Sequence, residues 1–308
     1  MPEATLTRPD SPIGPAPLVP SPKRPRWLLH LVLFTATGYT ITLAGALREW
    51  MHLGQAEESL RVSLLFDPGF LAAGLPYSLC LLAILTAHEM GHYVACRHYG
   101  VDASLPFFIP SLPVPIGTFG AFIRIRAPIP SRKALFDIGV AGPLAGFVVA
   151  LPIIVYGFLT APAGSPPVGA PVEQLPLLMR WLSAGLLGDV PGGYDAMRSG
   201  PLRAGWVGCL ATALNLLPIG QLDGGHLCYA LSARFHRLAS RVSLVAFVTL
   251  GLLVFPGWLF FATLLIMLGA KHPPVLDEWE GLDRARLATA AGALVILLLC
   301  FIPRPFSF

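Results

Sequence analysis

The chain has 308 residues, of which 55% are hydrophobic and only 12% are charged. Soluble domains carry about 25% charged residues, so this composition excludes an ordinary soluble protein and indicates a polytopic membrane protein. The net charge of +4 is small and the basic residues are spread over loops, which argues against nucleic-acid binding. The five cysteines are scattered without a Cys-x-x-Cys pair, which argues against a disulfide framework.

The first 26 residues are rich in proline and end in the basic residues Lys23, Arg24 and Arg26. Such a segment is expected to be disordered, because it has too little apolar surface to form a core. Basic residues directly before the first apolar run favour a cytoplasmic N-terminus. We therefore expect a disordered cytoplasmic tail over residues 1–26 and a membrane-embedded domain over residues 27–308.

Long apolar runs predict that most of the remaining chain forms transmembrane helices. The predicted spans cover residues 27–47, 68–95, 135–159, 204–222 and 287–302. Residues 242–270 are ambiguous, because they form either one long helix or a hairpin that breaks at Pro256 and Gly257. The expected fold is thus all-α, with six or seven transmembrane helices.

Three connecting segments carry signals of their own. Residues 121–126 alternate at a period of two, and the prolines within residues 101–132 disfavour a helix. We therefore predict a small membrane-associated β hairpin between the second and third spans. A short amphipathic helix is expected near residues 175–187. The arginines at positions 234–241 predict a cytoplasmic loop.

The motif His88-Glu-Met-Gly-His92 follows a run of 20 residues, Pro68 to Ala87, that contains no charged side chain. A helix of that length covers about 30 Å, which is the thickness of the hydrocarbon core of a bilayer. His88 and His92 share one helix face, so both imidazoles can bind one cation. Glu89 beside them can act as a base toward water at the metal. Ionisable groups at such a place are costly and usually functional.

Asp223 is the best candidate for a third ligand, because a catalytic zinc ion normally has three protein ligands and one open position. It ends the charge-free run from Ala204 to Leu222, which is 19 residues long. Both runs therefore reach their polar residues at the same expected depth in the membrane. Proline and glycine around Asp223 predict a broken helix, which a membrane tolerates only where the backbone lines a cavity or is buried in protein.

Two motifs, paired in this order, resemble those of the site-2 protease family of intramembrane zinc metalloproteases. The first is His-Glu-Met-Gly-His at residues 88–92, and the second is Asn-Leu-Leu-Pro-Ile-Gly-Gln-Leu-Asp-Gly-Gly-His at residues 215–226. The likeness extends to Phe-Asp-Ile-Gly-Val-Ala-Gly-Pro-Leu-Ala-Gly at residues 136–146. The expected catalytic core covers about residues 68–230.

The resemblance implies that His88, His92 and Asp223 bind one Zn²⁺ ion per chain. It implies that Glu89 is the catalytic acid/base and that Asn215 contacts the substrate or the oxyanion. The implied activity is hydrolysis of peptide bonds in membrane-spanning protein substrates, as in regulated intramembrane proteolysis. The implied location is the lipid bilayer of a bacterial inner membrane, with several spans and the N-terminus in the cytoplasm.

Two alternatives belong to other functional classes. A metal transporter also needs intramembrane His and Asp side chains, but transporters usually show repeat symmetry and several acidic residues along a path. A non-catalytic homologue that binds membrane proteins would be expected to lack the glutamate or a ligand, whereas Glu89 and all three candidate ligands are present.

Other polar and small residues have more ordinary interpretations. His226 either supports the metal site or caps the helix break, and residues 119–126 either pair with an unwound substrate or form a flap. Asp137 is expected to complement a helix dipole, and Gly142 and Gly146 are expected to be packing positions. The remaining histidines considered are expected to be ordinary interfacial residues: His30, His52, His98, His236 and His272.

Overall fold

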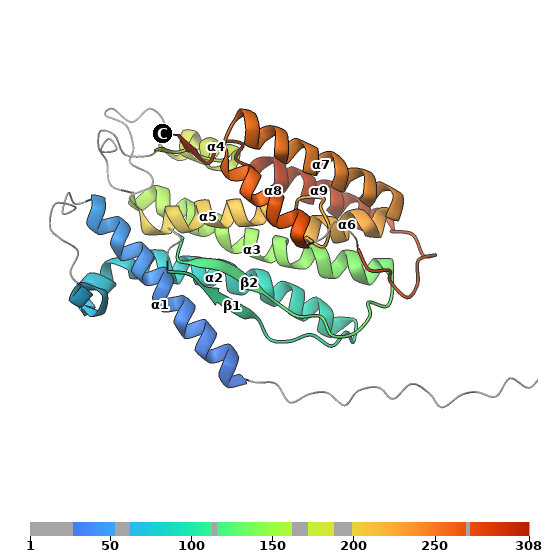
Figure 1. Ribbon diagram of the computed structural model, residues 1–308, viewed down its shortest axis with the longest axis horizontal. Coiled ribbons are helices and arrows are strands. Elements are labelled where there is room, and N and C mark those ends of the chain that lie inside the picture. Colours follow the sequence, from blue (N-terminus) through green and yellow to red (C-terminus); the bar gives the residue numbers. More distant parts are fainter. Residues whose placement is uncertain are drawn as a thin grey trace, which may run out of the picture.

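The computed structural model shows a mainly helical protein (Figure 1). It describes residues 27–52, 62–112, 116–161, 172–187, 199–268 and 272–307. The predicted disordered tail lies outside the described residues. The helices are α1 Trp27–His52, the 3-10 helix η2 Val62–Phe66, α2 Pro68–His98, α3 Arg132–Thr160, α4 Leu177–Leu187, α5 Gly200–Asn215, α6 Asp223–Leu231, α7 Ala233–Leu253, α8 Gly257–Leu268 and α9 Arg284–Cys300. The strands are β1 Phe107–Pro110, β2 Thr118–Phe122, β3 Val172–Glu173 and β4 Phe306–Ser307.

Helix α2 carries the histidine motif and begins at the predicted residue. The Asp67 carboxylate caps it by accepting the N–H of Phe70 at 2.7 Å, and Pro68 stands in the first turn, where no N–H is needed. The helix continues for 31 residues. His88 and His92 therefore lie near its C-terminal end, against the first half of α3.

Helix α3 is central, because it contacts α2, α4, α5, α6 and α9. Small residues allow the close approaches around it and between α1 and α2. A Cβ atom added to Gly91 of α2 would lie 2.4 Å from the Ala141 carbonyl oxygen of α3, and one added to Gly74 would lie 1.9 Å from the Thr42 carbonyl oxygen of α1. Apolar helices in lipid gain little from hydrophobic burial, so such close packing holds them together.

Four described helices are long and apolar enough to cross a membrane, namely α1, α2, α3 and α7. This finding supports an integral membrane protein, while the total of six or seven spans stays a prediction. The predicted span at residues 204–222 is shorter than expected, because α5 ends at Asn215. The chain then turns through residues 216–222 before α6 begins at Asp223.

The region after α6 differs from one part of the prediction. The predicted loop around the arginines at positions 234–241 is wrong, since these residues lie within α7. Ser232 caps this helix by accepting the N–H of Arg234 at 3.2 Å, so the helix starts before its apolar part. Helix α7 ends at Leu253 and α8 begins at Gly257, which is the hairpin alternative broken at Pro256.

Strands β1 and β2 form the predicted small antiparallel hairpin. It lies against α1 and α2 (Figure 1). Strand β2 ends at Phe122, four residues before the predicted end at position 126. Beyond it the chain stays beside residues 102–104, through an isolated bridge between Ala103 and Ile125. Strands β3 and β4 form a second antiparallel pair.

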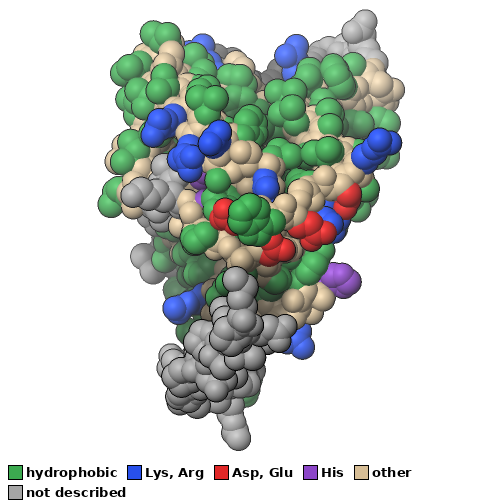
Figure 2. Space-filling view, turned by 90° about the vertical axis from the view of Figure 1, so that its right-hand side faces the viewer, with side chains coloured by type: hydrophobic (Ala, Val, Ile, Leu, Met, Phe, Trp, Pro, Cys, Tyr) green, Lys and Arg blue, Asp and Glu red, His purple; other side chains and the backbone are tan. Residues whose placement is uncertain are grey.

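Charged side chains of both signs gather at the end of the molecule that Figure 2 faces, while hydrophobic side chains cover its flanks. Asp137 was expected to complement a helix dipole, but it binds α9 instead. Its carboxylate accepts hydrogen bonds from Arg286 at 2.9 and 2.5 Å and from the Tyr99 hydroxyl. Arg132 likewise donates to the carbonyls of Ala230 and Leu231 at the end of α6. These contacts join α2, α3, α6 and α9 at this end.

Candidate metal centre

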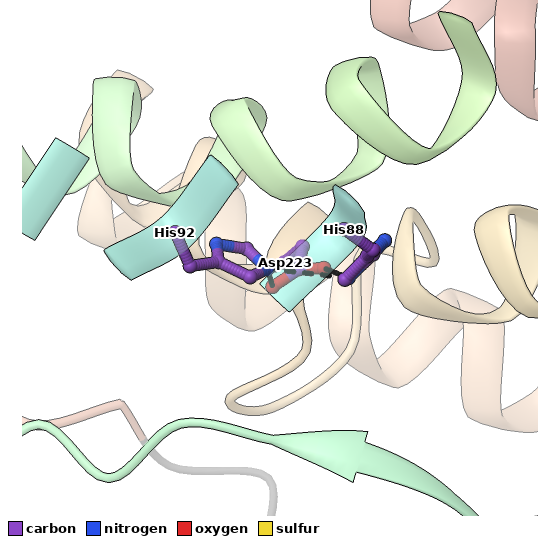
Figure 3. Close-up of side chains that lie close together, drawn as sticks. All are labelled: His88, His92 and Asp223. Carbon is purple, nitrogen blue, oxygen red and sulfur yellow. Dashed lines mark hydrogen bonds and ion pairs between the residues drawn. The ribbon is translucent and has the colours of Figure 1, made fainter. Parts of the chain in front are cut away.

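Three buried or half-buried side chains converge between α2 and the start of α6 (Figure 3). The Nε2 atom of His88 lies 3.2 Å from Asp223 Oδ2, and that of His92 lies 3.3 Å from Asp223 Oδ1. The two Nε2 atoms are 3.2 Å apart. Among the described residues this is the one group of three His, Cys, Asp or Glu side chains close enough to share an ion.

The spacing of these donor atoms fits a zinc ion. Two ligand atoms about 2.0–2.1 Å from zinc, at a tetrahedral angle, lie about 3.3 Å apart. The observed separations of 3.2, 3.2 and 3.3 Å between neighbouring donor atoms are close to this value, and the two histidines face different oxygens of the Asp223 carboxylate. Two imidazoles and one carboxylate also leave one tetrahedral position open, as a catalytic zinc site requires.

The His92 ring is held in the orientation that a ligand needs. Its Nδ1 atom lies 2.7 Å from the Ile138 carbonyl oxygen on α3, and a carbonyl can only accept, so Nδ1 carries the proton. Nε2 is therefore the free nitrogen and faces Asp223. Such a hydrogen bond fixes the tautomer of a metal-binding histidine and raises its basicity.

Glycines of α3 leave room for both histidines. A Cβ atom added to Gly142 would lie 2.1 Å from His92 Nε2, and one added to Gly146 would lie 3.2 Å from His88 Cβ. These positions were expected to serve packing alone. The structure shows that they also accommodate the imidazoles, because a side chain at position 142 would occupy the space of the His92 ring.

Asp223 is positioned by a tight turn over residues 216–222. Gly220 adopts a left-handed conformation with φ of 54°, and a Cβ atom on Gly224 would lie only 1.9 Å from the Leu216 carbonyl oxygen. Helix α7 holds this turn, since His236 Nε2 donates to the Gly220 carbonyl oxygen at 2.9 Å. The Ser240 hydroxyl donates to the Pro218 carbonyl oxygen at 3.1 Å. The broken backbone is thus buried in protein, as predicted.

A cavity of about 200 Å³ opens beside the three donors. Glu89 lines it and is only 5% exposed, and Asn215 lines it from the end of α5. The Asn215 amide nitrogen lies 3.3 Å from His88 Nε2. The backbone of Ile123 is within hydrogen-bonding reach of the Glu89 carboxylate. The structure therefore brings together all five residues that the sequence singled out.

His226 also lines this cavity, and it contacts a residue that the sequence did not single out. Its Nδ1 atom lies 2.6 Å from Nε2 of His272, whose own Nδ1 lies 2.6 Å from the Pro273 carbonyl oxygen. The Pro273 carbonyl can only accept a hydrogen bond, so Nδ1 of His272 carries the proton. Nε2 of His272 therefore accepts a hydrogen bond from the protonated Nδ1 of His226. His226 thus presents an unprotonated Nε2 atom.

Sequence reasoning treated His236 and His272 as ordinary histidines, yet both support the site. Neither belongs to a local motif with ligand spacing, and each acts through a partner at least 16 positions away. The one local sign was the Pro273-Pro274 pair after His272, which restricts the backbone beside that ring.

Comparison with known proteins agrees with this geometry. The profile described as "Peptidase family M50" matches residues 76–256, which is more than half of the chain. This chain belongs to Peptidase family M50. The matched segment includes both motifs and the three candidate zinc ligands His88, His92 and Asp223.

Curated relatives carry zinc metalloprotease names. The chain is 31% identical over 243 residues to "Probable zinc metalloprotease EGY2, chloroplastic" of Arabidopsis thaliana, covering 76% of this chain and 43% of that protein. It is 34% identical over 247 residues to "Probable zinc metalloprotease EGY1, chloroplastic" of Oryza sativa subsp. japonica, covering 76% and 41%. The chain thus spans less than half the length of these relatives.

Proposed function

We propose that this protein is a zinc metalloendopeptidase that cleaves membrane-spanning protein substrates within the bilayer. His88, His92 and Asp223 would hold one zinc ion, Glu89 would act as acid/base, and Asn215 would contact the substrate. The convergence of these two imidazoles and one carboxylate, whose neighbouring donor atoms lie 3.2–3.3 Å apart between apolar helices, carries the proposal. Membership of Peptidase family M50 and the names of the relatives support it.

The roles of the side chains follow from their places in the cavity. A zinc ion at this site supplies a Lewis acid and allows water to be deprotonated near neutral pH. Glu89 takes the proton of the attacking water and passes it to the leaving amine, since its buried carboxylate lines the same cavity. The amide of Asn215 can donate to the oxyanion that develops on the substrate.

The substrate would lie as an extended strand along the chain that continues β2. The Arg124 carbonyl accepts from Ser104 at 3.0 Å, and the Arg126 N–H donates to Asp102 at 2.8 Å. Alternate residues of a strand direct their backbone groups to opposite edges. The N–H and C=O groups of Ile123 and Ile125 therefore point away from residues 102–104. A peptide bond shielded inside a substrate helix becomes accessible when that segment unwinds and pairs here.

We also propose that the N-terminus and the C-terminal end of α2 face the cytoplasm. Basic residues before α1 support this orientation. In that arrangement residues 1–26 form a cytoplasmic tail, and residues 27–308 form the membrane-embedded domain with its catalytic core at about 68–230. A bacterial inner membrane is the location that we propose, although the named relatives are chloroplastic.

The decisive test compares Glu89→Gln and His92→Ala with the unaltered protein. The chain is purified, reconstituted in proteoliposomes with single-span reporter polypeptides, and assayed for cleavage and bound zinc. We expect Glu89→Gln to keep one zinc ion per chain and lose cleavage by about 10²–10⁴-fold, the usual contribution of a general base. His92→Ala should lose both.

Other outcomes would overturn the proposal. Full cleavage by Glu89→Gln would exclude the acid/base role. Zinc flux across the proteoliposome membrane without cleavage would favour the transporter alternative. Zinc binding without cleavage of any reporter by the unaltered chain would favour the non-catalytic, membrane-protein-binding alternative.

A further inference from the structure

A second and larger cavity adjoins the metal centre. It has a volume of about 700 Å³, within the range of about 300–1,000 Å³ typical of ligand sites. Ile123, Gln221 and His226 line both this cavity and the smaller one beside the donors. The two spaces therefore adjoin each other, and a chain bound at the metal centre can extend toward the larger one.

The larger cavity lies between two segments that are far apart in the sequence. One is residues 122–129, which follow β2, and the other is residues 272–275, which precede α9. Beyond the cavity these segments join, because the N–H of Leu276 donates to the Ile129 carbonyl oxygen at 3.1 Å. At its other end His272 lies 2.6 Å from His226, which holds residues 272–275 against α6.

The shape and the backbone of this space suit an extended polypeptide. Ile123 and Ile125 direct their N–H and C=O groups away from residues 102–104, which pair with the opposite edge of this extended segment. Both residues line the cavity. A strand that enters it can therefore pair with this edge, which starts next to the catalytic Glu89.

The charges of the cavity wall are of one sign. Arg124 and Arg126 line it, and none of its described lining residues is an aspartate or glutamate. Arg126 has an acidic neighbour outside the wall, Asp102, at 3.7 Å. The Arg124 side chain is exposed, and its guanidinium makes no hydrogen bond or ion pair among the described residues. His272 adds no charge near neutral pH, because burial lowers its pKa to about 4.

We propose that this cavity is a subsite for the substrate residues that flank the scissile bond, and that Arg124 selects an acidic side chain there. A carboxylate in the cavity can pair with the guanidinium in a bidentate, charge-assisted contact. A basic side chain would meet two arginines and no carboxylate in the wall. The proposal rests on the endopeptidase function proposed above and specifies which substrates that function accepts.

The test is a competition among reporters in proteoliposomes that contain the purified full-length chain. The reporters are single-span polypeptides with a randomised segment beside the membrane-spanning part, and the products are sequenced by mass spectrometry. We expect Asp or Glu to be enriched at one position near the cleaved bond. For an acidic reporter, Arg124→Gln should lower kcat/KM about tenfold, the usual effect of losing one charge-assisted contact. Arg124→Glu should shift the enrichment to Lys or Arg.

Controls separate this proposal from the function on which it depends. Arg97→Gln removes one exposed positive charge from the end of α2, lines neither cavity, and should leave the enrichment unchanged. Zinc content should stay at one ion per chain in every variant of Arg124. Cleavage that requires Glu89 but shows no acidic enrichment would overturn the subsite alone. Absence of cleavage, or cleavage without Glu89, would overturn the endopeptidase function and the subsite with it.

Discussion

At Gly142 the absence of a side chain leaves the space that the His92 imidazole occupies. A methyl group there would lie 2.1 Å from His92 Nε2, which is far shorter than a van der Waals contact. The His92 ring must therefore move in the Gly142→Ala variant. We expect zinc affinity to fall at least about tenfold, as for other changes that disturb the support of a metal ligand. Zinc per chain, measured by mass spectrometry of the purified protein, checks this expectation.

Gly292→Ala is the matched control for that substitution. Gly292 lies in α9, and a Cβ atom added there would have no neighbour within 4 Å. This variant should keep its zinc and its thermal stability. Unchanged zinc affinity in Gly142→Ala would contradict the role of Gly142 in leaving room for the His92 ring.

His272 links a loop to the site in a way that depends on pH. Burial, together with the nearby His236, lowers its pKa from 6.5 to about 4. The groups facing it are His226 at 2.6 Å, the stacked ring of Tyr229 at 4.2 Å and the His236 ring at 5.7 Å. Because the protonated form is disfavoured in the folded protein, the contact is fully stable above pH 6.5 and weakens as the pH falls toward 4.

Hydrogen–deuterium exchange of residues 272–277 tests this expectation. After correction for intrinsic rates, protection should decrease between pH 6.5 and 4, while the amides of α9 keep theirs. In His272→Gln, which cannot be protonated, the pH dependence should disappear. Protection that is independent of pH in the unaltered chain would contradict the buried, neutral state of His272.

Helix boundaries were predictable where a local signal marks them. Asp67 and Pro68 mark the start of α2, and the long charge-free run that follows predicts a membrane-spanning helix, although α2 continues beyond that run to His98. The start of α7 was missed, because arginines at the end of an apolar helix look like a loop when only charge is considered. Its cap, Ser232, is a weak sequence signal without a glutamate three residues later.

Helix α7 supports the metal centre without contributing a ligand to it. His236 and Ser240 lie one turn apart on this helix and hold the turn that precedes Asp223. We expect His236→Ala and Ser240→Ala to weaken zinc binding by about ten- to hundredfold, because the Asp223 carboxylate loses its fixed place. Competition with a chelator measures the affinity.

Thr249→Ala is the control for these two substitutions. Thr249 is an exposed residue of the same helix, and its hydroxyl donates only to the Val245 carbonyl oxygen among the described residues. Its removal should leave zinc affinity unchanged. An effect of similar size in Thr249→Ala would mean that the losses reflect a general weakening of α7.

At the scale of the whole molecule, the pairing of distant segments was only partly predictable. The common depth of His88 and Asp223 follows from two charge-free runs of similar length, 20 and 19 residues, so their meeting was expected. The contact between residues 272–275 and the chain after β2 has no such signal. It depends on how α3 and α9 are joined through Asp137 and Arg286, which lie 149 positions apart. Only the folded chain reveals that pairing.

The proposed orientation in the membrane can be tested with two positions at opposite ends of the bundle. Trp279 is 97% exposed in the connection between α8 and α9, and Phe66 is 71% exposed between α1 and α2 (Figure 1). The native cysteines are buried or half-buried, so the unaltered chain is a control with little labelling. An impermeant maleimide should label Trp279→Cys in inside-out vesicles and Phe66→Cys in right-side-out vesicles. The reverse pattern would place the N-terminus outside, and labelling of both from one side would contradict a bundle that crosses the membrane.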